Sequence, residues 1–100
     1  MNMEFRYEEE KIYLLDESRK TIGEIDIPKR DEKRIDITHV FVDESLRGQG
    51  YAQALMQTAY DYIKKQGKLI VAKCPYAIAW FKKHYECQDI VINVKTGPKV

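Results

Sequence analysis

Residues 40–52 place a glycine-bearing turn between an apolar run and the start of an amphipathic segment, an order that can hold an anion. The first N–H groups of a helix have no partner inside the helix, and the helix macrodipole is positive at that end. Gly48 and Gly50 carry no side chain that would keep a ligand from the backbone, and Arg47 adds a permanent positive charge. The segment therefore predicts a phosphate-bearing ligand at the start of this helix.

Two well-known phosphate-binding loops do not fit this segment. The P-loop needs a Lys-Ser or Lys-Thr pair after its last glycine, and none follows Gly50. The dinucleotide-binding fingerprint needs a third glycine, but position 53 is Gln53. The alternative to a ligand site is that the two glycines only allow a strand and a helix to pack closely.

Cys74 is the most pointed candidate for chemistry outside this turn. It precedes Pro75, and proline is typical of the first helical position, so Cys74 is expected to be the N-cap of a second helix. A thiolate there would be favoured by the helix dipole and by Lys73, and it could act as a nucleophile or as an acid or base. The alternative is a small buried residue that only caps the helix.

Three further side chains could take part in chemistry. His39 lies on a mostly apolar strand face, which suits a core histidine, a catalytic base or a partner that orients Cys74. Tyr76 could donate a proton to a leaving group or simply pack, and His84 could contact a ligand or end the second helix with a favourable charge. The two histidines and two cysteines, Cys87 included, contain no C-x₂₋₄-C pair, so no metal site is expected.

The strands that position these residues begin with three short apolar or alternating runs. Residues 5–7, 12–15 and 22–27 are separated by polar turns, which predicts antiparallel strands. Pro28 ends the third run, and the charged residues 29–33 are expected to form a solvated loop.

Residues 34–42 are predicted to form one central strand before the glycine turn. Alternation then assigns the residues to two faces: Ile35, Ile37, His39 and Phe41 on one, and Asp36, Thr38, Val40 and Val42 on the other. The second face changes from polar to apolar at Val40, so the end of the strand should be covered on both sides, by a helix or a ligand.

An amphipathic helix is predicted to follow Gly48 and to reach Gln66, with Gly67 as its stop. Its core-facing stripe should consist of Ala52, Leu55, Met56, Ala59 and Ile63. Residues 68–72 are predicted to form a short strand whose Leu-Ile-Val-Ala core is apolar on both faces, which suits a buried strand parallel to the one before the helix. The strand, helix and strand then form one right-handed crossover unit.

The second helix is predicted to start at Pro75 and to bury Ala77, Ile78, Phe81 and Tyr85. Its aromatic residues, Trp80 among them, are expected in the core rather than in a substrate pocket. Residues 90–92 could form a final strand or a packed tail, and residues 96–100 are expected to fray.

Length and composition set the broad class. One hundred residues predict a single domain, residues 1–100, and a formal charge of +1 argues against a general nucleic-acid binder. No apolar stretch is long enough to span a membrane, and the N-terminus is too polar for a secretory signal. We therefore expect a cytoplasmic protein in which Cys74 and Cys87 are free thiols.

The turn also resembles a known family. Arg47-Gly48-Gln49-Gly50-Tyr51-Ala52, after Val40-Phe41-Val42, is similar to the acetyl-CoA signature [Q/R]-x-x-G-x-[G/A] of the GNAT superfamily. Small stand-alone GNAT-like proteins share a histidine-containing strand before the loop and a Cys-Pro-Tyr-like segment after the next strand. His39, Cys74-Pro75-Tyr76 and residues 80–84 match that pattern, so the resemblance covers most of positions 35–90.

The resemblance implies an α/β (α+β) fold: a mixed, mostly antiparallel twisted sheet with a splayed parallel strand pair and two main helices. Acetyl-CoA would enter the splay, its pyrophosphate would bind the N–H groups of residues 47–52, and its pantetheine amides would pair with the backbone near Phe41 and Val42. Cys74 and His39 would carry the transfer of the acetyl group to an amine, and Tyr76 would contact the cofactor.

The chain lacks the long helical segment that larger family members place between the first two strands and that often helps to shape the acceptor site. Two alternatives therefore stay open: a CoA- or acyl-CoA-binding module without turnover, and a protein-interaction domain. The expected partners are acetyl-CoA and an amine acceptor, small molecule or protein, without nucleic acid or membrane, in a monomer or weak homodimer.

Overall fold

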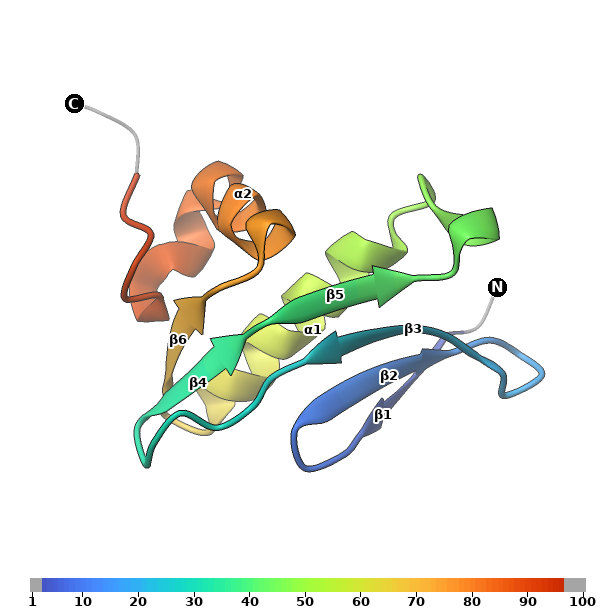
Figure 1. Ribbon diagram of the computed structural model, residues 1–100, viewed down its shortest axis with the longest axis horizontal. Coiled ribbons are helices and arrows are strands. Elements are labelled where there is room, and N and C mark those ends of the chain that lie inside the picture. Colours follow the sequence, from blue (N-terminus) through green and yellow to red (C-terminus); the bar gives the residue numbers. More distant parts are fainter. Residues whose placement is uncertain (1–2, 97–100) are drawn as a thin grey trace.

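The computed structural model describes residues 3–96 as a mixed sheet with a long helix on one face (Figure 1). The predicted fold class is confirmed, with antiparallel strands, one parallel pair and two main helices. In chain order the elements are β1 (Glu4–Tyr7), β2 (Lys11–Leu15), β3 (Thr21–Asp26), β4 (Arg34–Ile37), β5 (His39–Val42), the 3-10 helix η1 (Glu44–Leu46), α1 (Tyr51–Lys65), β6 (Leu69–Ala72), α2 (Pro75–Lys83) and the 3-10 helix η2 (Tyr85–Ile90).

The antiparallel part of the sheet has the strand order β1-β2-β3-β5. The antiparallel pairing of the three N-terminal runs is as predicted. Gly23 in β3 allows β5 and α1 to approach closely: a Cβ there would lie 2.9 Å from the Phe41 carbonyl oxygen and 3.1 Å from Leu55 Cδ1. Strand β5 and helix α1 therefore both pack closely against β3 at Gly23, which fixes the position of the end of β5.

Helix α1 covers one face of the sheet with the predicted apolar stripe. Leu55, Met56, Ala59 and Ile63 are fully buried, whereas Ala52, at the start of the helix, is half-buried. Gly67 has a positive φ of 72° directly after the helix, as expected for its C-terminal stop. No helix within residues 3–96 is long and apolar enough to cross a membrane.

The prediction of a single strand over residues 34–42 is wrong. The chain bulges at Thr38, which divides the segment into β4 and β5. The carbonyl oxygen of Asp26 accepts a hydrogen bond from the N–H of Thr38 at 3.1 Å, although Asp26 is paired with His39 in the register of β3 and β5. The extra residue reverses the alternation: Ile35 and Ile37 are buried before the bulge, and Val42 after it. His39 and Phe41 consequently face solvent instead of sharing a face with Ile35 and Ile37.

The bulge marks the point at which the sheet splays. Before it, β4 pairs in parallel with β6; after it, β3 is the one strand among residues 3–96 that pairs with β5. The N–H groups of Lys73 and Cys74 both donate to the carbonyl oxygen of Ile37, at 2.9 and 3.1 Å, and these bonds end the parallel contact. Beyond them β5 continues along β3 while the chain after β6 leads into α2 (Figure 1).

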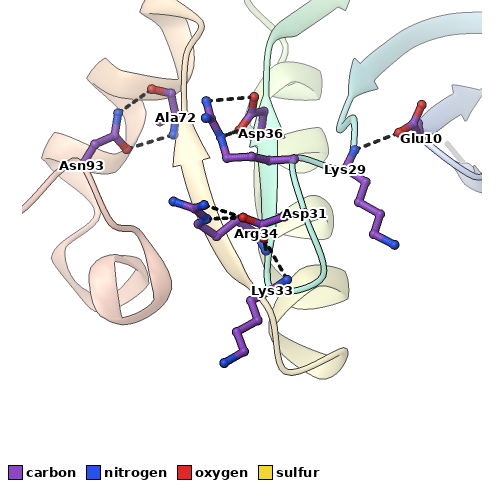
Figure 2. Close-up of polar contacts among 9 residues, drawn as sticks. Glu10, Lys29, Asp31, Lys33, Arg34, Asp36, Ala72 and Asn93 are labelled. Carbon is purple, nitrogen blue, oxygen red and sulfur yellow. Dashed lines mark hydrogen bonds and ion pairs between the residues drawn. The ribbon is translucent and has the colours of Figure 1, made fainter.

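The outer edge of β6 is closed by the C-terminal segment rather than by a full strand. Ile92 N–H donates to the Ile70 carbonyl oxygen, and the side-chain amide of Asn93 donates to and accepts from the backbone of Ala72 (Figure 2). Of the predicted segment 90–92, Ile90 ends η2, and Val91 forms only an isolated bridge with Ile70, so Val91 and Ile92 follow the packed-tail alternative and not the strand. Strand β6 is less buried than predicted, because Leu69 is 40% exposed.

Two predictions about the C-terminal third fail. Tyr85 is 47% exposed because the α-helix ends at Lys83 and a 3-10 helix begins at Tyr85, whereas Trp80 is buried as predicted. Thr96 is not frayed: its N–H donates to Oε1 of the buried Gln88 at 2.9 Å. The rest of the segment predicted to fray, residues 97–100, lies outside the described residues.

Candidate active site

A cavity of about 330 Å³ lies where β5 ends and α1 begins. The end of β5, the turn after it, the first turn of α1 and the start of α2 all contribute to its wall. The lining residues are Val40, Val42, Leu46, Arg47, Gly48, Gly50, Tyr51, Ala52, Gln53 and Tyr76.

The turn into α1 is built from a capped 3-10 helix and two left-handed glycines. Asp43 caps η1 by accepting hydrogen bonds from the N–H and the hydroxyl of Ser45, and these bonds hold the pKa of its carboxyl below the usual range. Gly48 and Gly50 have φ values of 84° and 86°, a conformation that glycine adopts at low cost. A Cβ at either glycine would meet nothing within 4 Å, so a side chain there would project into open space beside the cavity.

Within the described residues 3–96, no strand pairs with the edge of β5 that faces the cavity. Asp43 N–H donates to the Ile22 carbonyl oxygen at 2.8 Å, which fixes the side of the strand that pairs with β3. Backbone groups alternate in direction along an antiparallel strand, so the N–H and C=O groups of Val40 and Val42 point away from β3 and toward the splay. An extended chain with amide groups could pair with this edge, as an added strand would.

The backbone groups of Phe41 face β3, and its side chain lies on the opposite, solvent-exposed face. Phe41 is therefore not part of the cavity wall, and neither is Gln49, although Gln49 belongs to the same turn. Leu46 and Gln53 are part of the wall and were missed by sequence reasoning. Gln53 follows Gly50 by one helical turn, and this spacing was the signal that could have identified it.

Tyr76 joins the wall of the cavity from the first turn of α2. Its partial burial, and secondarily the nearby Cys74, raise the pKa of its hydroxyl above the usual value. The hydroxyl therefore keeps its proton near neutral pH and can act as a hydrogen-bond donor.

Cys74 is the N-cap of α2, as predicted, with extended backbone angles and Pro75 as the first helical residue. Its side chain is half-buried against the core and makes no capping hydrogen bond. Because the Cys74 N–H donates to the Ile37 carbonyl oxygen, the residue stands at the closed end of the splay. His39 is two residues beyond Ile37, and no hydrogen bond joins it to the Cys74 thiol in the described structure.

The exposed side chain of His39 lies beside an acidic pair that the sequence did not reveal. Asp26 is its cross-strand partner, and Lys11 Nζ lies 3.0 Å from a carboxylate oxygen of Glu24 and 3.4 Å from Asp26 Oδ1. Burial, and secondarily the hydrogen bond with Glu24, raise the pKa of the Asp26 carboxyl. The same hydrogen bond between the two carboxyl groups is the main cause that lowers the pKa of Glu24. Within residues 3–96, no three His, Cys, Asp or Glu side chains are grouped in a way that could hold a metal ion.

Comparison with known proteins identifies the class. The model of a family described as GCN5-related N-acetyl-transferase matches residues 11–90. The chain therefore belongs to this acetyltransferase family, as the resemblance of residues 47–52 implied. No match is found among curated proteins.

Solved structures with the same fold include a GCN5-like protein from Staphylococcus aureus, known from its NMR solution structure. It is 26% identical, with a TM-score of 0.76 over 96% of this chain and 94% of that chain. Tetrahymena GCN5 (21% identity, TM-score 0.63) covers 89% of this chain and 63% of its own. The Escherichia coli GNAT-family N-acetyltransferase YhbS, crystallised with CoA, is 24% identical with a TM-score of 0.56 over 62% of this chain and 38% of its own. The last two support the fold alone.

Proposed function

We propose that this protein binds acetyl-CoA in the cavity at the end of β5 and transfers the acetyl group to an amine. One observation carries the proposal: the glycine turn, the start of α1 and the unpaired edge of β5 line a single cavity. An anion-binding turn beside a strand edge matches a ligand that carries both phosphates and amides. The CoA bound to the fold relative YhbS supports the same assignment.

The pyrophosphate of the cofactor is assigned to the turn. The N–H groups of Gly48, Gln49, Gly50, Tyr51 and Ala52 lie at or before the start of α1, where the helix dipole favours negative charge. Arg47 supplies the compensating positive charge from the beginning of the turn.

The pantetheine arm is assigned to the free edge of β5, through the backbone groups of Val40 and Val42 rather than those of Phe41. This arm would run toward the closed end of the splay, where the Cys74 N–H is bonded to Ile37. Neither Cys74 nor His39 lines the cavity, and the exposed His39 side chain would meet the acceptor amine from the solvent face of β5. The thioester of acetyl-CoA supplies an activated acetyl group at that point.

Acetyl transfer requires three actions from the protein: the amine must lose a proton, the thioester carbonyl must be polarised, and the leaving sulfur must gain a proton. In the direct route a C–N bond forms as the C–S bond breaks, His39 takes the amine proton, and Tyr76, protonated near neutral pH, donates to the sulfur. In the alternative route the Cys74 thiolate attacks the thioester carbonyl, the C–S bond to CoA breaks, and CoA leaves as a thiol with a proton from Tyr76. The amine then attacks the acetyl-Cys74 thioester, loses a proton to His39 and releases the Cys74 thiolate as the second C–S bond breaks.

Cys74→Ala and Cys74→Ser variants distinguish these routes. Thiol release from acetyl-CoA is followed over a panel of amines and lysine peptides, with CoA affinity measured in parallel by calorimetry. The direct route predicts that both variants keep turnover, whereas the acyl-enzyme route predicts its loss at unchanged affinity and an added acetyl mass on Cys74 in the wild type.

A non-catalytic CoA-binding module is the second candidate. The observation that favours it is the connection between β1 and β2: residues 8–10 join them directly, without the helices that would shape an acceptor site. CoA binding without acetyl transfer to any amine in the panel would support this candidate and reject the proposed reaction.

A further inference from the structure

One contact ties the cavity to the second helix. Trp80, in α2 and only 4% exposed, donates its indole Nε1–H to Oε1 of Gln53 at 2.8 Å. Gln53 lies in the first turn of α1 and lines the same cavity as Gly50 and Arg47. A largely buried side chain thus holds a polar group at the cavity wall.

The chemistry of this contact fixes the orientation of the Gln53 amide. An indole N–H can only donate, so the amide atom that faces it must be the oxygen. The amide NH₂ group is then directed away from Trp80, and it has no hydrogen-bond acceptor within residues 3–96. Gln53 therefore presents two free donors at the end of the cavity where the turn and the helix dipole favour an anion.

Trp80 itself is held firmly. Its ring is stacked on the His84 imidazole, with centroids 3.8 Å apart and planes 14° from parallel, and it meets Phe81 edge-on at 5.2 Å. His84 Nδ1 lies 2.7 Å from the Trp80 carbonyl oxygen and the His84 N–H donates to the same oxygen, so His84 is bound to the residue on which it stacks. The indole donor is consequently fixed before any ligand arrives.

We propose that Gln53 donates a hydrogen bond to a phosphate oxygen of the bound cofactor and that Trp80 is the positioning residue that keeps the amide oriented for it. This inference rests on the proposed function, since it assumes that the anion is the phosphate group of CoA. It assigns α2 a part in cofactor affinity. Preorganisation of the amide lowers the entropy lost when the ligand binds.

Gln53→Glu provides the direct test by isothermal calorimetry with CoA. Glutamate can still accept the Trp80 hydrogen bond, but it replaces the NH₂ donors with a negative oxygen that faces the phosphate. We expect a loss of affinity of roughly 10- to 100-fold. Gln66→Glu adds the same charge at the other end of α1 and should leave the affinity unchanged.

The positioning role of Trp80 is tested by a double-mutant cycle. Trp80→Phe removes the indole donor and keeps an aromatic ring; it should weaken CoA binding about threefold to tenfold in the wild type, but not in a Gln53→Ala background. A purely packing role would instead predict the same loss in both backgrounds. Thermal unfolding confirms that each variant is folded.

Loss of CoA binding and loss of the Gln53 contact give different results. If the wild type does not bind CoA, the proposed function is rejected. If the wild type binds CoA and folded Gln53→Glu binds it with the same affinity, only the role of Gln53 is overturned. Pantetheine, which lacks the phosphates, separates the ends of the site: NMR titration should give the same affinity for the wild type and Gln53→Glu.

Discussion

Arg47 Nε donates a hydrogen bond of 3.2 Å to the carbonyl oxygen of Val42, the last residue of β5. The side chain that opens the glycine turn is thereby fastened to the strand that precedes the turn. One carbonyl on the cavity side of β5 is satisfied in this way, and the guanidinium is held beside the start of α1. Since the other guanidinium nitrogens can still donate, Arg47 can bind the protein and an anion together.

Replacement of Arg47 by alanine and by lysine should show how much of the CoA affinity comes from its charge and how much from its planar guanidinium. We expect Arg47→Ala to weaken CoA binding at least tenfold while the free energy of unfolding changes by less than about 0.5 kcal/mol, because the side chain is exposed. Arg47→Lys should lie in between, since it keeps the charge but not the planar fork. Arg19→Ala, which removes the same charge from an exposed turn, serves as the control in calorimetry. Equal effects of the two alanine variants would contradict a specific role for Arg47.

Gly50 and Gly67 form a matched pair for testing the turn. Both have positive φ values, 86° and 72°, and a Cβ at either would meet nothing within 4 Å. Alanine at each position should therefore cost a similar strain energy, on the order of 1 kcal/mol in urea unfolding. Only Gly50→Ala should also lower CoA affinity, because only Gly50 lines the cavity. Equal CoA affinities of the two variants would argue against a ligand at the turn.

The two cysteines should differ in reactivity. Cys87 is 2% exposed and burial raises the pKa of its thiol to about 11, whereas Cys74 is only half-buried. Iodoacetamide at about pH 8 is expected to modify the native protein once, at Cys74, and the unfolded protein twice. If CoA occupies the splay, it should slow the reaction at Cys74. Peptide mass spectrometry with Cys74→Ser as control reads out both results, and first modification at Cys87 would contradict the described burial.

Asp31 should make stability depend on pH at the acidic end. It accepts hydrogen bonds from Arg34 and from the N–H groups of Lys33 and Arg34, and these hold the pKa of its carboxyl at about 2 (Figure 2). Because the folded pKa lies below the unfolded value of 3.8, the carboxylate stabilises the fold above about pH 4. This contribution is lost as the pH falls toward 2.

Asp31→Asn keeps an oxygen that can accept from the loop N–H groups but does not titrate. The stability advantage of the wild type over this variant should therefore shrink between about pH 4 and pH 2 in denaturant unfolding. A constant difference across this range would show that the Asp31 carboxylate is not coupled to folding.

The bulge at Thr38 shows where sequence reasoning reached its limit. The elements around it followed from local pattern, since apolar alternation, Pro75 and Gly67 each have a local physical meaning. In the sequence the apolar residues shift from odd positions (Ile35, Ile37) to even positions (Val40, Val42). Alternation alone did not show that this shift marks an inserted residue. The bulge depends on Asp26, which meets Thr38 and His39 only after β3 pairs with β5.

The residues of the candidate site also fall into those that local sequence predicts and those that depend on tertiary contacts. The glycine turn and the N-cap Cys74 could be predicted because each depends on a few neighbouring residues. The bond between Trp80 and Gln53 could not, because it requires α1 and α2 to meet in space. The acidic pair beside His39 was missed for the same reason: Lys11, Glu24 and Asp26 come together only across neighbouring strands.

The most direct test of the central claim is an NMR titration of ¹⁵N-labelled protein with CoA. If the cavity at the end of β5 is the cofactor site, the largest amide shift changes will fall on residues 40–53, with Tyr76 included, and saturate at one CoA per chain. The N–H signals of Val40 and Val42 should be among them, whereas those of β1 should stay unchanged. Absence of saturable shifts, or shifts concentrated away from residues 40–53, would contradict the account.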